Sequence, residues 1–303
     1  MDIKFGTNEV FIFFLGNQLK KPLKCIIVIT PLTQGGFLLS AKIGFIGFGN
    51  IAQAIVKGAS KGYITPEQIY IYDPLPEKTE LATRYGFEVC QSEPELVSKC
   101  DYVFLTVKPQ IYAEILSKIK ASLAHEMCIV SVAAGKTISF IQQSVGFECR
   151  VIRAMPNTPL LVGSGVCALS ASFSTPKESF DFITGLFSVC ALTEQVDEGM
   201  LNAVTAVSGS GPAYVFAFAR AVIEAGEQAG LSAQTAMQLF TSTLIGSAKM
   251  IQQYGNCGKL IEMVASPNGT TEAALNHMQE NGFEPLVKSA VQACLRRAEE
   301  LSK

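Results

Sequence analysis

The chain has 303 residues, of which 49% are hydrophobic, and its formal net charge is −2. Its length is about twice that of a typical domain, which predicts two domains, each with its own core. The small, interspersed charge disfavours nucleic acid as a partner, and the apolar runs are shorter than the roughly 20 residues that cross a bilayer, so we expect no membrane partner.

Residues 1–40 hold two short apolar runs around Lys20, Lys21 and Pro22. They lack the longer apolar stretch and the small-residue cleavage site of a secretory signal. We therefore expect an atypical, poorly ordered extension, or a start codon assigned too far upstream. The nine cysteines are scattered without a CxxC pair, which predicts no metal site and reduced, mostly buried thiols in a cytoplasmic protein.

From residue 41 to 197, short runs rich in Val and Ile alternate with amphipathic stretches, as in βαβ units around a parallel sheet. The predicted strands are 42–46, 68–72, 102–107, 128–133, 150–154 and 164–169. From 198 to 303 the pattern becomes helical without a convincing strand. The predicted helices there are 198–206, 212–229, 232–254, 258–265 and 270 to the C-terminus.

A glycine motif, Gly47-x-Gly49-x-x-Ala52, follows the first predicted strand and opens a helix. Its glycines allow a tight turn and the close approach of a pyrophosphate, which the free N–H groups of the helix N-terminus would bind. The motif predicts a Rossmann-type dinucleotide-binding domain over 41–197. The alternative is a glycine turn in another α/β protein, which the strand, turn and helix context disfavours.

Asp73 ends the second predicted strand, 26 residues after Gly47. A carboxylate at this point accepts hydrogen bonds from a ribose 2′-hydroxyl and repels a 2′-phosphate, so taken alone it favours NADH over NADPH. The alternative is a surface Asp-Pro turn, because Pro74 follows directly.

Three further loops follow predicted strands. The loops 106–109 and 131–135 should flank the nicotinamide half of the cofactor, because ligands of open α/β sheets bind beyond the carboxyl ends of the strands. Lys108 is either a cationic anchor or an ordinary lysine at a strand end. Asn157 stands between Pro156 and Pro159, where it either aims its amide at a ligand or belongs to a stiff connector.

Two loops of small residues, 207–214 and 265–272, are each predicted to open a helix and to present N–H groups to an anion such as a carboxylate. Either loop could instead be a simple helix cap. His125 and His277 lie away from the predicted strand ends, which disfavours a histidine-driven 2-hydroxy-acid dehydrogenase and a serine hydrolase. An imine substrate needs only a weaker hydrogen-bond donor.

Six short motifs occur together in one order: Gly44-Phe-Ile-Gly-Phe-Gly-Asn, Val107-Lys-Pro, Ser131-Val-Ala-Ala-Gly, Arg153-Ala-Met-Pro-Asn-Thr-Pro, Val207-Ser-Gly-Ser-Gly-Pro-Ala-Tyr and Ser266-Pro-Asn-Gly-Thr-Thr. With them the chain resembles pyrroline-5-carboxylate reductase over about 42–302. The resemblance implies an α/β Rossmann domain followed by an all-helical dimerisation domain over 198–303. It also implies NAD(P)H-dependent reduction of L-1-pyrroline-5-carboxylate to L-proline, the last step of proline biosynthesis, by intertwined homodimers that often form a ring of five.

The resemblance also assigns residues to the site. The substrate end is implied for Glu198, Ser210, Thr270 and Thr271. Ser210 and Thr271 are the expected catalytic residues: the Thr271 hydroxyl would hydrogen-bond the imine nitrogen, and the amides of Thr270 and Thr271 would hold the substrate carboxylate. The implied cofactor contacts are Ile46, Gly47, Phe48, Gly49, Asn50, Ile51, Thr106, Val107, Lys108, Pro109, Val132, Ala133 and Ala134, and Asp73 joins them from the fingerprint above.

Three residues depart from the family pattern. Asn268 replaces a glycine, and Asn is the residue that best tolerates a left-handed backbone, so we expect the loop to survive. Glu93 stands where many relatives carry an asparagine that touches the adenosine, and Asp73 where they often carry a small hydroxyl residue. The cofactor is therefore left as NADPH or NADH. The alternatives are a related imine or β-hydroxy-acid reductase, for which Lys249 is the lysine to consider, and a cofactor-binding protein without catalysis.

Overall fold

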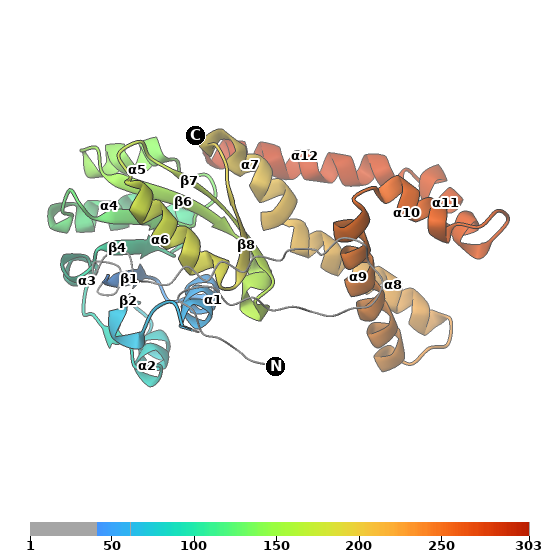
Figure 1. The fold of residues 1–303 in the computed structure, drawn as a ribbon, viewed down its shortest axis with the longest axis horizontal. Coiled ribbons are helices and arrows are strands. Elements are labelled where there is room, and N and C mark those ends of the chain that lie inside the picture. Colours follow the sequence, from blue (N-terminus) through green and yellow to red (C-terminus); the bar gives the residue numbers. More distant parts are fainter. Residues whose placement is uncertain (1–40, 61, 303) are drawn as a thin grey trace, which may run out of the picture. The chain divides into compact units, whose positions relative to one another are not determined.

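The computed structural model describes residues 41–60 and 62–302 (Figure 1). Two units divide the chain, residues 1–41 and 42–303. The extension expected at 1–40 lies outside the described residues. The second unit begins with an α/β sheet structure and continues into helices (Figure 1).

The strands of the described chain form one eight-stranded sheet in the order β3-β2-β1-β4-β5-β6-β7-β8. All six predicted strands are present. The sequence analysis missed two edge strands, β3, which has two residues, and β8, which is largely polar and exposed. The bounds are β1 (Ile43–Ile46), β2 (Ile69–Tyr72), β3 (Glu88–Val89), β4 (Tyr102–Leu105), β5 (Cys128–Ser131), β6 (Arg150–Pro156), β7 (Gly165–Ala171) and β8 (Ala191–Gln195).

One pair of neighbours departs from the predicted parallel sheet, because β7 runs antiparallel to β6. Residues 157–164 connect these strands through a short 3-10 turn, Thr158–Val162. A parallel pair of strands needs a crossover of about a dozen residues or more. The connection between β6 and β7 is shorter than this, so the chain reverses direction. Strands β1 to β6 are parallel, and their carboxyl ends therefore lie at one edge of the sheet.

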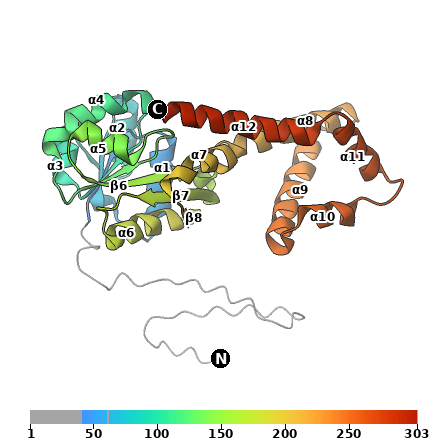
Figure 2. The same cartoon turned by 90° about the horizontal axis from the view of Figure 1, so that it is seen from above.

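Helices cover both faces of this sheet, with α3, α4 and α5 on one side and α6 on the other (Figure 2). The face under α3 to α5 holds a buried cluster that includes Leu96, Leu116 and Ile141. Apolar residues recur on the inner side of each helix, which is the pattern that predicted them. The bounds are α1 (Asn50–Ala59), α2 (Pro76–Arg84), α3 (Glu93–Lys99), α4 (Tyr112–Ile119), α5 (Ile138–Val145) and α6 (Lys177–Ser188).

The residues from 198 onward are helical, as predicted. The predicted single helix from 270 to the C-terminus is wrong, since it breaks at Asn281 and Gly282. Gly282 has a φ of 69°, a left-handed conformation in which glycine commonly ends a helix. The bounds are α7 (Leu201–Val204), α8 (Gly211–Gln228), α9 (Ala233–Tyr254), α10 (Cys257–Val264), α11 (Thr270–Glu280) and α12 (Phe283–Leu301).

These helices bury little within one chain. Between 211 and 302 the buried residues are Ala236 and Ala298. The helical stretch Glu198–Gln228 is long and apolar enough to cross a membrane by length and composition alone, with 6% of its most apolar window buried. The expectation that every apolar run would be too short is therefore wrong for this stretch, whose exposed apolar side needs a covering surface.

Candidate functional site

The glycine turn is built as predicted at the carboxyl end of β1. Gly47 has a φ of 95°, and a Cβ there would lie 2.9 Å from the Val107 side chain and 3.1 Å from the Thr106 carbonyl oxygen. Only glycine fits a turn packed so closely on the loop after β4. Gly49 caps α1 without a side-chain hydrogen bond, and a Cβ on it would meet no atom within 4 Å. The space beside Gly49 at the start of α1 is therefore open.

Asp73 belongs both to this turn and to the Asp-Pro turn. Its Oδ2 accepts a hydrogen bond of 2.7 Å from the Phe48 amide, and its Oδ1 accepts one of 3.0 Å from the Leu75 amide. The Gly47 amide donates to the carbonyl of Tyr72, 2.8 Å away, just before Asp73. The carboxylate is thus held beside the glycine turn, as the dinucleotide fingerprint requires.

Thr106 supports the same turn from β4. Its Oγ1 lies 2.6 Å from the carbonyl oxygen of Gly47 and 3.0 Å from that of Ile46, so the hydroxyl donates to the turn. Lys108 is exposed and forms no ion pair among the described residues, which leaves both interpretations of this lysine open. Because β1 and β4 are neighbours, their loops meet at the point where the strand order reverses.

Tyr112 lies under these loops and was missed by the sequence analysis. Its hydroxyl donates to the carbonyl of Leu105, 2.6 Å away, and accepts from Ser131 at 3.2 Å. Burial raises the pKa of the Tyr112 phenol well above its ordinary value, so it stays a neutral donor. A single tyrosine in an amphipathic helix looks like any core residue, so no signal marked this link between the ends of β4 and β5.

Glu93 is buried where the family's adenosine contact was expected. Lys118 Nζ lies 3.3 Å from its Oε1. The pKa of Tyr72 is raised, first by burial and then by the charge of Glu93. The Glu93 carboxylate therefore already has partners in the protein.

The two interpretations of Asn157 are decided by its contacts. Its Oδ1 accepts from the Val166 amide at 2.8 Å, and its Nδ2 donates to the Ser208 carbonyl at 3.1 Å. Both ends of a buried amide are thus used within the protein. These contacts favour the connector interpretation, in which Asn157 joins the end of β6 to the helices.

The serine-glycine motif 207–214 does not form the predicted loop. Its first residues belong to a π-helical turn, Thr205–Gly209, and its last residues open α8, with Pro212 in the first turn as predicted. The Ser210 amide donates to the Thr205 carbonyl at 2.9 Å, so it is not free for an anion. Pro212 has no N–H to continue the ordinary helical ladder, and π-turns are frequent at functional sites. The Ser210 hydroxyl lies 3.2 Å from Cys294 Sγ of α12.

The second loop, 265–272, opens α11 as predicted. Asn268 has a φ of 59°, which confirms that Asn takes the left-handed backbone of the missing glycine. Gly269 caps the helix without a side chain, and Glu272 accepts from the Asn268 amide at 2.7 Å and holds the loop. Among the described residues, no hydrogen bond or ion pair of one chain joins Thr270 or Thr271 to Ser210.

Glu198 has partners of its own in the sheet structure. Its Oε1 accepts from the Ile138 amide at 2.7 Å and from Arg153 Nη1 at 2.9 Å. Arg153 is buried, with 6% of its side chain exposed. The substrate contact that the resemblance implies for Glu198 stays a prediction.

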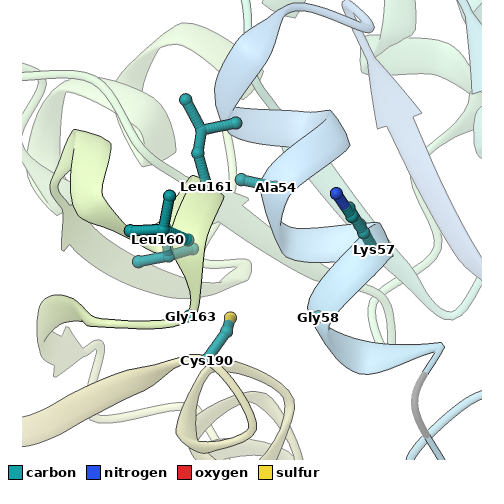
Figure 3. Close-up of a pocket in the computed structure, with 8 residues that line it drawn as sticks. Ala54, Lys57, Gly58, Leu160, Leu161, Gly163 and Cys190 are labelled. Carbon is teal, nitrogen blue, oxygen red and sulfur yellow. The ribbon is translucent and has the colours of Figure 1, made fainter.

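A pocket of about 220 Å³ lies apart from these residues, between α1 and the turn after β6 (Figure 3). Its lining is mostly apolar, with Lys57 as its charged residue and Cys190 at its base. It contains none of the predicted site residues, and it is smaller than the roughly 300 Å³ of an ordinary ligand site. We do not assign the cofactor to it.

Comparison with known proteins decides the family. The helical residues 198–301 match the model described as "Pyrroline-5-carboxylate reductase dimerisation", and residues 42–135 match "NADP oxidoreductase coenzyme F420-dependent". Pyrroline-5-carboxylate reductase of Escherichia coli (strain K12) is 37% identical over 269 residues, which cover 88% of this chain and 100% of the relative. The chain belongs to the pyrroline-5-carboxylate reductase family. The Arabidopsis thaliana member is 34% identical over 268 residues, 87% of this chain and 96% of that protein.

Solved structures of pyrroline-5-carboxylate reductases share this fold. The Plasmodium falciparum enzyme with NADP bound has a TM-score of 0.82 and 28% identity, covering 88% of this chain and all of that one. The Coxiella burnetii enzyme has a TM-score of 0.78 and 33% identity, covering 87% and 99%. These comparisons confirm the resemblance, the α/β class with its helical C-terminal part and the NAD(P)-dependent oxidoreductase class. They leave the choice between NADPH and NADH open.

Proposed function

We propose that the chain reduces L-1-pyrroline-5-carboxylate to L-proline with NADPH or NADH, the last step of proline biosynthesis. The observation that carries this proposal is the full-length match to the E. coli reductase, because one chain then contains both the glycine turn and the α11 loop. Lys249, the lysine to consider for a β-hydroxy-acid reductase, is exposed on α9 and forms no ion pair that the described residues show.

The cofactor site is proposed at the carboxyl edge of β1, β4 and β5. The open space before Gly49 and the uncapped start of α1 fit a pyrophosphate. Asp73 is placed for the adenosine ribose and Lys108 for the nicotinamide half. The proposed contacts are Ile46 to Ile51, Asp73, Thr106 to Pro109 and Val132 to Ala134.

The substrate end is proposed at the start of α11. The amides of Thr270 and Thr271, at a helix N-terminus without a side-chain cap, would bind the substrate carboxylate. The Thr271 hydroxyl would donate to the ring nitrogen, with Ser210 completing the site; the resemblance adds Glu198, whose Oε1 already accepts from the Ile138 amide and from Arg153. The bound nicotinamide supplies a hydride to the C=N carbon, and a proton completes the amine, so NAD(P)H and H⁺ are consumed for each proline formed.

Two copies of the chain are proposed to share this site. Large apolar side chains of α8 to α10, such as Phe216 and Met263, are more than half exposed, whereas the matching family model describes a dimerisation region. A second copy covers such a surface without a membrane, and the apolar stretch Glu198–Gln228 would lie in the interface. We propose a cytoplasmic homodimer, which assembles further into a ring of five, with domains 41–197 and 198–303.

The experiment that tests the function mixes the purified chain with pyrroline-5-carboxylate and either NADPH or NADH. Oxidation of the nicotinamide, with formation of one L-proline per cofactor, is the expected result. Turnover of keto acids or 2-hydroxy acids in place of the imine would favour the alternative reductase. Cofactor binding without turnover of any of these substrates would favour the non-catalytic alternative.

A further inference from the structure

Arg153 of β6 and Asn157, the residue after this strand, each bind the helical segment that leads to Ser210. The first contact joins Arg153 to Glu198, and the second joins Asn157 to the Ser208 carbonyl. Glu198 and Ser208 are the two ends of the stretch 198–208, which includes all but the last residue of the π-helical turn. Both ends of this stretch are thus fixed to β6 or to the residue after it, and the next residues bring the chain to Ser210.

The Arg153–Glu198 pair is built as a buried connection. The guanidinium is almost wholly buried, whereas the carboxylate keeps 32% of its side chain exposed. Glu198 is the ion-pair partner that the described residues offer Arg153. A buried charge that loses such a partner is left uncompensated, so removing either group should disturb the other.

The same carboxylate oxygen reaches a third element. Its bond to the Ile138 amide places a negative charge at the first residue of α5, where the helix dipole and a free N–H favour it. Helix α5 directly follows the loop that contains Val132 to Ala134, the proposed nicotinamide contacts. Beside this loop, a Cβ on Gly135 would lie 2.6 Å from the Leu301 carbonyl oxygen of α12, so the loop is tightly packed on that side as well.

We propose that Arg153 and Glu198 form a positioning pair, which sets the distance between the nicotinamide loop and the helix that carries Ser210. The proposal rests on the proposed function. Glu198 then acts through Arg153 and Ile138 rather than through contact with the substrate. Misplacement of reacting groups by about 1 Å costs on the order of a hundredfold in rate, so such a pair acts chiefly on kcat.

The test compares Glu198→Ala, Arg153→Met and the double variant in the full chain. Each single variant should lower kcat by about tenfold or more, while KM for pyrroline-5-carboxylate and Kd for the cofactor, from nicotinamide fluorescence, change less than about threefold. The double variant should be no slower than the slower single variant, because both changes break one connection. Glu198→Gln keeps both hydrogen bonds but not the counter-charge of Arg153, so its kcat should lie between those of Glu198→Ala and the wild type.

Asp197→Asn is the matched control, since this neighbouring carboxylate is exposed and caps nothing with its side chain. It should leave kcat unchanged. A rise of KM in Glu198→Ala at unchanged kcat would overturn the proposal in favour of substrate contact. Effects that multiply in the double variant would overturn it as well.

Amide hydrogen exchange provides a readout that does not depend on the substrate. Exchange in the peptide containing Ile138 should rise in Glu198→Ala and stay near the wild-type rate in Glu198→Gln. If the chain has no reductase activity but Ile138 still exchanges faster in a folded Glu198→Ala variant, the proposed function fails and the link from Glu198 to α5 is supported. Unchanged exchange in both variants would overturn the positioning pair, whatever the substrate. If Glu198→Ala does not fold, Glu198→Asp replaces it, with the same expected results.

Discussion

The sheet structure, residues 42–195, and the helices, residues 198–302, differ in how much of their apolar side chains one chain buries. The sheet structure buries whole strands and the inner faces of its helices, including Phe45, Phe104 and Leu96. The helices leave side chains such as Phe216 and Met263 more than half exposed. A segment with so much exposed apolar surface gains its stability from a partner. The sheet structure therefore closes its core within one chain, whereas the helices, which match a dimerisation model, are proposed to cover theirs with a second copy.

The largest effect on stability is expected when one buried and one exposed phenylalanine are each replaced by alanine. Phe104→Ala should lower the free energy of unfolding by about 3–5 kcal/mol, because it leaves a cavity in a closed core. Phe216→Ala should instead make the melting temperature depend more steeply on protein concentration, since it weakens a subunit contact. Thermal unfolding at several concentrations measures both; equal behaviour of the two variants would contradict the comparison.

A charge placed on the exposed apolar surface of the helices should prevent two copies from associating. Phe216→Asp places a charge in the proposed interface and should convert the protein to monomers with about a hundredfold lower activity, because a buried unpaired charge costs several kcal/mol. Light scattering after gel filtration and initial rates measure these effects. Phe173→Asp is the control, since Phe173 is fully exposed in the sheet structure and should change neither. A fully active Phe216→Asp monomer would refute the shared site.

The third prediction concerns the chemistry of the helical half. Thr271→Ala removes the proposed donor to the imine nitrogen and should lower kcat/KM about tenfold to a hundredfold, within the lower range of such contributions. Steady-state kinetics with pyrroline-5-carboxylate measure it. Thr83→Ala, which loses an exposed hydroxyl on α2, is the matched control. Unchanged kcat/KM in Thr271→Ala would eliminate the hydroxyl role.

The smallest expected effect lies in the sheet half. Asp73→Ser removes the carboxylate beside the glycine turn and should raise the ratio of kcat/KM for NADPH to that for NADH about tenfold, because the repulsion of a 2′-phosphate is relieved. Measuring both cofactors in the wild type and the variant decides this. A ratio that does not move would show that the Asp73 carboxylate serves the turn alone.

The sequence predicted what depends on local pattern. The six strands follow from short apolar runs, and the turn follows from Gly47, whose positive φ and close contacts accommodate only glycine. The exposed edge strand β8 and the reversed direction of β7 escaped prediction, because strand direction depends on the length of a connection rather than on strand composition.

Prediction of the site failed where the partner of a residue is distant in sequence. The contacts of Asn157 with Ser208 and of Arg153 with Glu198 span 51 and 45 residues. The local sequence around each residue does not indicate which distant residue it contacts. Pro212 lies in the first turn of α8, as predicted, but the π-turn Thr205–Gly209 directly before it has no signal in the sequence and replaces the expected loop. The loop that opens α11 was predicted because its signal is local.

The central claim, that two copies complete one substrate site, is tested most directly by hybrid dimers. Chains carrying Ser210→Ala and chains carrying Thr271→Ala are each purified, then unfolded and refolded as an equal mixture. If one site takes Ser210 from one copy and Thr271 from the other, each hybrid contains one intact site, and the mixture should regain about a quarter of wild-type activity. A mixture no more active than the two variants measured separately would contradict the claim.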